Sequence, residues 1–184
     1  MNKYLETKRI YLRELSSIDE DQLFNLDSDS EVMKYLTHGK ASTRDNIQKM
    51  IASVSTQLRQ SNGKYGVWAA IEKESSEFIG WFHLFPPKDD SEHVQKLFLG
   101  YRLKRKHWGK GYASEVSKVL IEKAFSEYEA SEVCAQSMKA NTRSQKVMLN
   151  AGMTFSHEFT EKSFPQGSQE AVLFSIRNSS LKNG

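Results

Sequence analysis

Two glycines between a predicted strand and a predicted helix constrain this chain more than any other feature. Gly109 and Gly111 lie between an apolar segment, residues 97–103, and an amphipathic segment, residues 113–128. The first segment is typical of a strand and the second of a helix. A helix start offers unpaired backbone N–H groups and the positive end of the helix dipole, and glycines let the backbone approach an anion closely. The spacing therefore predicts a phosphate-binding turn.

The spacing also separates three kinds of phosphate loop. A P-loop requires Lys followed by Ser or Thr, whereas Lys110 is followed by Gly111, which excludes that loop. The dinucleotide-binding loop G-x-G-x-x-G is matched only in its first half, because Ser114 stands at its third glycine. The segment better resembles the Q/R-x-x-G-x-G/A loop of the GNAT acetyltransferases, with Lys106 where that family has Gln or Arg. The structural alternative is a glycine-rich helix start without a ligand.

Further segments resemble this family in the same order along the chain. They are residues 7–14 (TKRIYLRE), 30–36 (SEVMKYL), 78–82 (FIGWF), 108–115 (WGKGYASE), 141–144 (NTRS) and the pair Gly152-Met153. Together they cover about residues 7–176 and resemble the branch that includes the ribosomal-protein N-terminal acetyltransferases. The resemblance implies a single GNAT-like α/β domain over residues 1–178, with a polar tail at 179–184.

The expected fold has a mixed, mostly antiparallel central sheet with flanking helices. The sequence order indicates a β-α-β crossover in the second half of the chain, formed by residues 96–103, the helix after the glycines, and residues 133–137. The resemblance implies that these two strands splay apart and that the pantetheine arm of acetyl-CoA pairs with the exposed strand edge between them.

Composition limits the other possibilities. A formal charge of +3 is too small to indicate nucleic acid, and no apolar run reaches the length of a membrane helix. The N-terminus lacks the apolar core of a signal peptide, and the single cysteine, Cys134, excludes an internal disulfide. We therefore expect a cytoplasmic protein without nucleic-acid or membrane partners. We further expect a monomer or homodimer without a metal, although composition does not distinguish the two oligomeric states.

The resemblance implies acetyl-CoA as the acyl donor. Backbone N–H groups around the glycines would hold its pyrophosphate, nearby cations would hold the remaining phosphate, Asn141 would bind the pantetheine arm, and Ser144 would contact the sulfur. The residues expected at this cofactor are Leu103, Lys104, Lys106, Trp108, Gly109, Lys110, Gly111, Tyr112, Ala113, Asn141 and Ser144. For each cation, an ordinary solvated surface charge is the alternative.

Acetyl transfer to an amine also requires stabilisation of the developing oxyanion and a neutral amine. A backbone N–H near Leu103 is the candidate for the oxyanion. A protein α-amine has a pKa near 8, against about 10.4 for lysine, so it is neutral roughly 300 times more often at pH 7. His83, Glu170 and Glu158 are candidate bases, although His83 between Phe82 and Leu84 could equally be a packed strand residue.

Proton delivery to the thiolate departs from the wider family. Many relatives have a tyrosine four residues beyond the position of Ser144, where this chain has Met148. In the branch that acetylates ribosomal proteins the serine of Asn-x-x-Ser takes that place, so the predicted catalytic residues are Ser144, His83 and Glu170. A plain helix cap is the alternative for Ser144.

These features predict an acetyl-CoA-dependent N-acetyltransferase in which a primary amine, such as a protein N-terminal α-amine, attacks directly in a ternary complex. The acceptor could instead be a small-molecule amine such as a polyamine or an amino sugar. Two further hypotheses are a non-catalytic acyl-CoA-binding module and a nucleic-acid-binding domain that uses the basic loop with Trp108 and Tyr112 as stacking groups.

Overall fold

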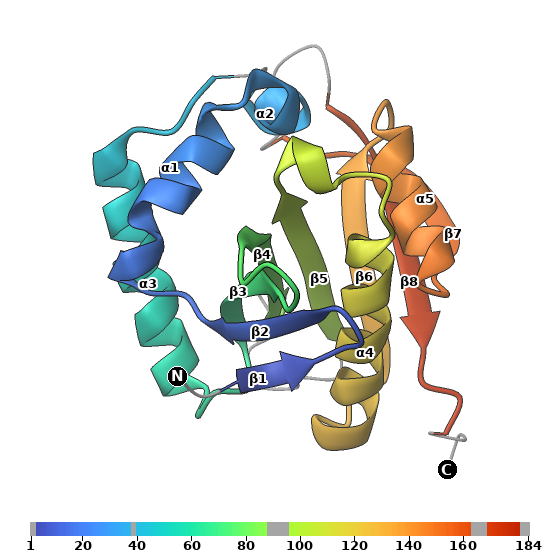
Figure 1. Ribbon diagram of the computed structural model, residues 1–184. Coiled ribbons are helices and arrows are strands. Elements are labelled where there is room, and N and C mark those ends of the chain that lie inside the picture. Colours follow the sequence, from blue (N-terminus) through green and yellow to red (C-terminus); the bar gives the residue numbers. More distant parts are fainter. Residues whose placement is uncertain (1–2, 38–39, 88–95, 163–168, 181–184) are drawn as a thin grey trace.

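The computed structural model describes residues 3–37, 40–87, 96–162 and 169–180. Within these ranges eight strands form one sheet in the order β1-β2-β3-β4-β5-β6-β8-β7 (Figure 1). The strands are β1 (Lys3–Glu6), β2 (Ile10–Glu14), β3 (Gly66–Glu72), β4 (Phe78–Phe85), β5 (Lys96–Leu103), β6 (Glu132–Met138), β7 (Thr154–Thr160) and β8 (Glu170–Arg177). The helices are α1 (Glu20–Ser28), α2 (Ser30–Thr37), α3 (Arg44–Gln60), α4 (Tyr112–Glu127) and α5 (Thr142–Asn150).

Helices cover both faces of the sheet (Figure 1). On one face α4 and α5 close a core that includes Phe82, Leu99 and Leu120, and on the other α1, α2 and α3 close a second core around Val54 and Ile71. Alternation along β4 explains this division, because Phe82 and Leu84 face α4 whereas Trp81 and Phe85 face α3.

The crossover predicted for the second half of the chain is confirmed. Neighbouring strands pair antiparallel except β5 and β6, which are parallel and are connected through α4. Helix α4 supplies the long connection that parallel strands require. The predicted α/β fold, with a mixed and mostly antiparallel sheet, is therefore confirmed.

Strands β5 and β6 pair over only a short length. Their register joins Lys96–Phe98 to Glu132–Cys134 and goes no further. Beyond Phe98 the two strands diverge, and Figure 1 shows β5 leaning away from β6 toward the end that leads into the glycine loop. The expected splay is thus present, and its closed end lies next to Leu99 and Gly100.

The predicted elements agree with the structure to within a few residues, with one omission. Strand β1 was not predicted, because its four residues carry charges at both ends and show no clear apolar alternation. Thr43 caps α3, since its side chain accepts a hydrogen bond from the Asn46 N–H. Residues 181–184 of the predicted tail lie outside the described residues.

Candidate functional site

The glycine loop forms a concentration of unpaired backbone donors at the start of α4. Gly111 is the N-cap residue, with a φ of 81°, and it has no side chain to cap the first turn. The N–H groups of Tyr112, Ala113 and Ser114 therefore receive no side-chain cap. Gly109 has a φ of 75°, a left-handed conformation that glycine adopts without strain. The loop can thus bind an anion through its backbone alone.

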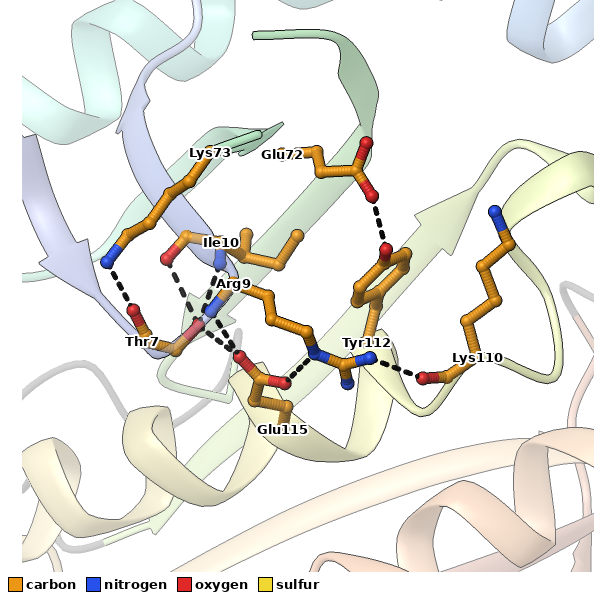
Figure 2. Close-up of polar contacts among 8 residues, drawn as sticks. All are labelled: Thr7, Arg9, Ile10, Glu72, Lys73, Lys110, Tyr112 and Glu115. Atoms are coloured by element: carbon orange, nitrogen blue, oxygen red, sulfur yellow. Dashed lines mark hydrogen bonds and ion pairs between the residues drawn. The ribbon is translucent and has the colours of Figure 1, made fainter. Parts of the chain in front are cut away.

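The N-terminal segment holds this loop in place (Figure 2). The Glu115 carboxylate accepts hydrogen bonds from the Thr7 hydroxyl at 2.6 Å and from the Arg9 backbone N–H at 2.9 Å, and it pairs with Arg9 Nε at 2.6 Å. Burial alone would raise the pKa of Glu115, but these hydrogen bonds outweigh it and the pKa is lowered. The opening strand motif and the glycine-loop motif are therefore physically joined.

Tyr112 and Arg9 add a second connection between the loop and the sheet. The Tyr112 hydroxyl donates a short hydrogen bond to Glu72 at the end of β3, and the Arg9 guanidinium lies over the Tyr112 ring, 4.4 Å from its centroid. The bond to Glu72 raises the pKa of Tyr112. Both contacts fix the first turn of α4 relative to β2 and β3.

The predicted cations of the loop differ in what they contact. Lys106 Nζ lies 2.5 Å from a Glu77 carboxylate oxygen, and Lys104 Nζ donates to Gln22 at 2.7 Å and lies 3.4 Å from Glu77. Burial lowers the pKa of Lys104. In Figure 2 the side chain of Lys110 extends away from the contacts around Arg9.

Trp108 anchors the loop to the strand that precedes it. Its indole N–H donates to the Leu103 carbonyl at 2.8 Å, and the Arg143 guanidinium at the start of α5 lies 5.3 Å from its ring centroid. Arg143 thus adds a cation beside the loop that the sequence analysis did not single out.

The edge of β5 that faces the gap carries unpaired backbone groups. The Lys104 N–H donates to the Ile79 carbonyl of β4, and the register of the two strands is regular up to that point. Because hydrogen bonding alternates along an antiparallel pair, the backbone groups of Leu99, Tyr101 and Leu103 are directed toward β6, at or beyond the end of the pairing, and of these the Leu103 carbonyl already accepts from the Trp108 indole. Leu103, the residue predicted at the oxyanion, lies on this edge.

Three polar side chains meet beside the gap. Asn141 and Ser144 were predicted from the sequence, and Tyr101 was not. The Asn141 side chain accepts from the Ser144 N–H at 3.2 Å and caps α5, a contact that is compatible with a role at the cofactor. The Ser144 hydroxyl lies 3.4 Å from the Tyr101 hydroxyl, which comes from β5. Burial raises the pKa of Tyr101 to about 12, so its phenol stays protonated at neutral pH.

Sequence reasoning missed Tyr101, although a signal for it existed. Alternation along β5 places residue 101 on the same face as Leu99 and Leu103, toward α4 and α5. Met148, one turn beyond Ser144, is 2% exposed and packs in the core on that face. A hydroxyl is therefore present near Ser144 even though α5 has no tyrosine at position 148.

His83 lies on the face of the sheet that α3 covers, opposite to Tyr101 and Ser144. Along the strands it is level with the closed end of the gap. It pairs in register with Gly100, and a Cβ atom added at Gly100 would lie 2.2 Å from His83 Nε2. The imidazole therefore lies directly over the glycine. Burial lowers the pKa of His83 to about 4, with a smaller contribution from Arg102, so the ring is neutral at pH 7.

A cavity of about 370 Å³ opens beside His83, between the sheet and α1, α2 and α3. Its apolar lining consists of Met33, Ile47, Met50, Val54, Val67 and Trp81. Among the described residues that line it, Asp27 and Arg102 are the charged ones, and they form a short ion pair with each other. Sequence analysis missed this pair, because 75 residues separate its members.

The remaining candidates lie away from this cavity. Glu170 is an exposed residue at the start of β8, and Glu158 on β7 pairs with Lys139 at 2.7 Å. The structure therefore does not bring the three predicted catalytic residues together: His83 lies on the α3 face of the sheet, Ser144 lies beside Tyr101 on the other face, and Glu170 is exposed at the start of β8. Cys134 is fully buried, and burial raises the pKa of its thiol to about 11, which makes it unreactive.

Two searches for other site types were negative within the described part of the chain. No group of three or more His, Cys, Asp or Glu side chains there is arranged to hold a metal ion. No described helix combines the length and the hydropathy that a membrane span requires.

Comparisons with known proteins point to one family. Residues 9–154 match the family model described as an acetyltransferase (GNAT) domain. The chain is 31% identical to the FsC-acetyl coenzyme A-N(2)-transacetylase of Aspergillus fumigatus, over 94% of this chain and 75% of that protein.

Two solved structures illustrate the likeness in fold. The ribosomal-protein-S5-alanine acetyltransferase of Vibrio fischeri superposes with a TM-score of 0.77 at 18% identity, covering 100% of both chains. The microcin C7 self-immunity acetyltransferase, solved in complex with acetyl-CoA and AMP, superposes with a TM-score of 0.78 at 15% identity, covering 93% of both chains.

Proposed function

Because this chain belongs to the GNAT acetyltransferase family, it is an acetyl-CoA-dependent N-acetyltransferase, and we propose that its acceptor is an α-amine such as a protein N-terminus. The observation that carries this proposal is the cavity beside a neutral His83, at the closed end of the gap between β5 and β6, which has a largely apolar lining and no unpaired charge among its described residues. Family membership argues against a non-catalytic acyl-CoA-binding module. The choice among acceptor amines is based on the residues that line the cavity.

The proposed arrangement brings the two substrates together from opposite faces of the sheet. The glycine loop binds the pyrophosphate of acetyl-CoA, and the pantetheine arm pairs with the edge formed by Leu99, Tyr101 and Leu103. The thioester then reaches the closed end of the gap, beneath Gly100. The acceptor amine approaches from the cavity on the α3 face, past His83.

The charge of the cavity favours a single amine over a polycation. Asp27 and Arg102 neutralise each other, and the other described lining residues are apolar or uncharged. Polyamines and aminoglycosides carry several positive charges, and each of these would need a carboxylate or water to replace its hydration. An amine attached to a small apolar group suits this lining better, and the first residue of a protein has that chemistry.

The low pKa of His83 favours an acceptor amine that is already neutral when it binds. An α-ammonium group has a pKa near 8, so transfer of its proton to an imidazole of pKa about 4 is uphill by about 5 kcal/mol. Neutral His83 can instead accept a hydrogen bond from the attacking nitrogen, which becomes acidic only as the C–N bond forms. This chemistry suits an α-amine far better than a lysine side chain.

The departing thiolate needs a hydrogen-bond donor, and the pair of hydroxyls at Ser144 and Tyr101 is our candidate. The amine nitrogen bonds to the carbonyl carbon and loses one proton through the His83 imidazole to solvent in the cavity. The C–S bond then breaks, and the sulfur leaves as a thiolate that receives a hydrogen bond from Ser144, supported by the protonated Tyr101. Backbone N–H groups on the β5 edge, with Leu103 as the first candidate, would stabilise the oxyanion before that cleavage.

A panel of acceptors tests the proposal. Release of CoA is measured with acetyl-CoA and peptides that carry a free N-terminal Ala or Ser, with the same peptides N-acetylated and bearing one internal Lys, and with spermidine and an aminoglycoside. We expect kcat/KM for a free α-amine to exceed that for the blocked lysine peptide by about 100-fold or more, in line with the difference in neutral fraction. Preferential turnover of spermidine or of the aminoglycoside would contradict the α-amine proposal.

The dependence of the rate on pH is a second prediction. At saturating acetyl-CoA, kcat/KM for a peptide should rise between pH 6 and 9 with one apparent pKa that matches the peptide's own α-amine, near 8. His83 adds no inflection in this range, since its pKa of about 4 leaves it neutral throughout. Peptides with different α-amine pKa values should shift the profile. An inflection near pH 6.5 that disappears in His83→Gln would contradict this prediction.

A further inference from the structure

The orientation of one peptide unit in the glycine loop depends on a side chain from the opposite end of the chain. Arg9 Nη1 donates to the Lys110 carbonyl at 2.9 Å (Figure 2). In a trans peptide the C=O of one residue and the N–H of the next point in opposite directions. The Gly111 N–H is therefore directed away from Arg9, to the open side of the loop where α4 begins.

We propose that Arg9 is a positioning residue for the pyrophosphate of acetyl-CoA: it aims the Gly111 N–H, and with it the first turn of α4, at the phosphate. The inference rests on the phosphate-loop assignment in the proposed function. It concerns a residue in the turn before β2, which lies about a hundred positions from the loop in sequence.

The contacts of Arg9 fit a positioning role because its planar guanidinium group contacts three different residues at once. Its Nε pairs with Glu115, its Nη1 reaches the Lys110 carbonyl, and its plane covers the Tyr112 ring. Glu115 is itself held by Thr7 and by the Arg9 backbone, so the guanidinium is clamped from behind. A lysine ammonium could keep the charge but lacks the fixed fork and the flat face that make these three contacts at once.

Gly111 lies within reach of the same group. A Cβ added there would come no closer than 3.5 Å to Arg9 Nη2, and this is its one neighbour within 4 Å among the described residues. The guanidinium thus lines the inner side of the loop and leaves the other side open to a ligand.

Two Arg9 variants and two acyl donors test the inference. Arg9→Gln and Arg9→Lys are compared with Lys8→Gln, which removes a neighbouring charge. Each is assayed with acetyl-CoA and with S-acetylpantetheine, which has the thioester arm but no pyrophosphate. We expect both Arg9 variants to weaken acetyl-CoA binding about 10-fold or more by calorimetry, the effect of losing one charge-assisted hydrogen bond, with kcat changed less than 3-fold. The kcat/KM for S-acetylpantetheine should stay at the wild-type value.

Other outcomes would overturn the inference in distinct ways. Recovery of acetyl-CoA affinity by Arg9→Lys would mean that only the charge of Arg9 matters. An equal loss with both acyl donors would mean that Arg9 supports the fold and not the phosphate contact. If Gly111→Asp abolishes acetyl-CoA binding while both Arg9 variants bind normally, the phosphate loop is correct and the role of Arg9 is wrong. If Gly111→Asp also binds normally, the loop assignment itself fails.

Discussion

Gly111→Asp is expected to abolish acetyl-CoA binding while leaving the protein folded. Gly111 is the N-cap of α4, and its lack of a side chain leaves the N–H groups of Tyr112, Ala113 and Ser114 without a cap. An aspartate there would place a negative charge beside the phosphate that these N–H groups would bind. Two unit charges about 4 Å apart in a protein surface interact by about 4 kcal/mol, which corresponds to about a 1000-fold loss of affinity.

The fold should tolerate this change. Asp and Asn adopt positive φ more readily than other side chains that have a Cβ. Among the described residues, the new Cβ has one neighbour within 4 Å, the Arg9 guanidinium at 3.5 Å, which is an attractive partner for a carboxylate. Calorimetry with acetyl-CoA and thermal unfolding of the free protein would measure the two effects separately.

Gly63→Asp is the matched control. Gly63 has the same φ of 81°, and a Cβ there would meet nothing within 4 Å. It lies in the turn after α3, where the neighbouring Tyr65 packs against Tyr128 at the far end of α4 from the glycine loop. This variant therefore introduces the same residue under the same backbone strain without a ligand nearby. We expect unchanged acetyl-CoA affinity. If Gly111→Asp binds acetyl-CoA as tightly as Gly63→Asp, the phosphate site is not at this loop.

The loop and the order of elements could be predicted because they depend on neighbours in sequence. Two glycines at a strand-to-helix turn set a backbone geometry that few other residues allow, and both have positive φ in the structure. The apolar segment over residues 97–103 predicted β5, and the amphipathic pattern over residues 113–128 predicted α4. Strand β1 could not be found this way, because four residues with charged ends acquire strand structure only by pairing with β2.

The contacts that position the site could not be predicted in the same way. Thr7 and Arg9 bind Glu115 across more than a hundred residues, and Arg102 pairs with Asp27 across 75. Residue type indicates that such charges need partners, but not which ones. His83 was identified by its chemistry, yet its low pKa follows from its burial in the folded sheet, which the sequence does not reveal.

Gly100→Ala is expected to lower turnover about 100-fold with little effect on acetyl-CoA binding, since small displacements of reacting groups cost this much. The new Cβ would lie 2.2 Å from His83 Nε2, so the imidazole must leave its place at the closed end of the gap. Acetyl-CoA binding should be spared, because the backbone groups of Gly100 are directed to β4 and not into the gap. Steady-state kinetics with a peptide acceptor and calorimetry with acetyl-CoA would measure the two quantities.

Gly66→Ala separates the loss of a strand glycine from the displacement of His83. Gly66 begins β3, and a Cβ there would meet the Leu58 side chain at 2.8 Å, the flexible end of which can move at little cost. We expect near wild-type kinetics for this variant. It would therefore report any general effect of replacing a glycine in the sheet.

The double variant Gly100→Ala/His83→Ala decides whether the effect acts through the imidazole. If displacement of His83 is the whole cause, adding Gly100→Ala to His83→Ala should not lower turnover further, because the ring that the new methyl group would displace is already absent. Additive losses would mean that the methyl group disturbs the gap itself. Wild-type turnover in His83→Ala alone would remove His83 from the reaction and leave the neutral cavity as the remaining support for an α-amine acceptor.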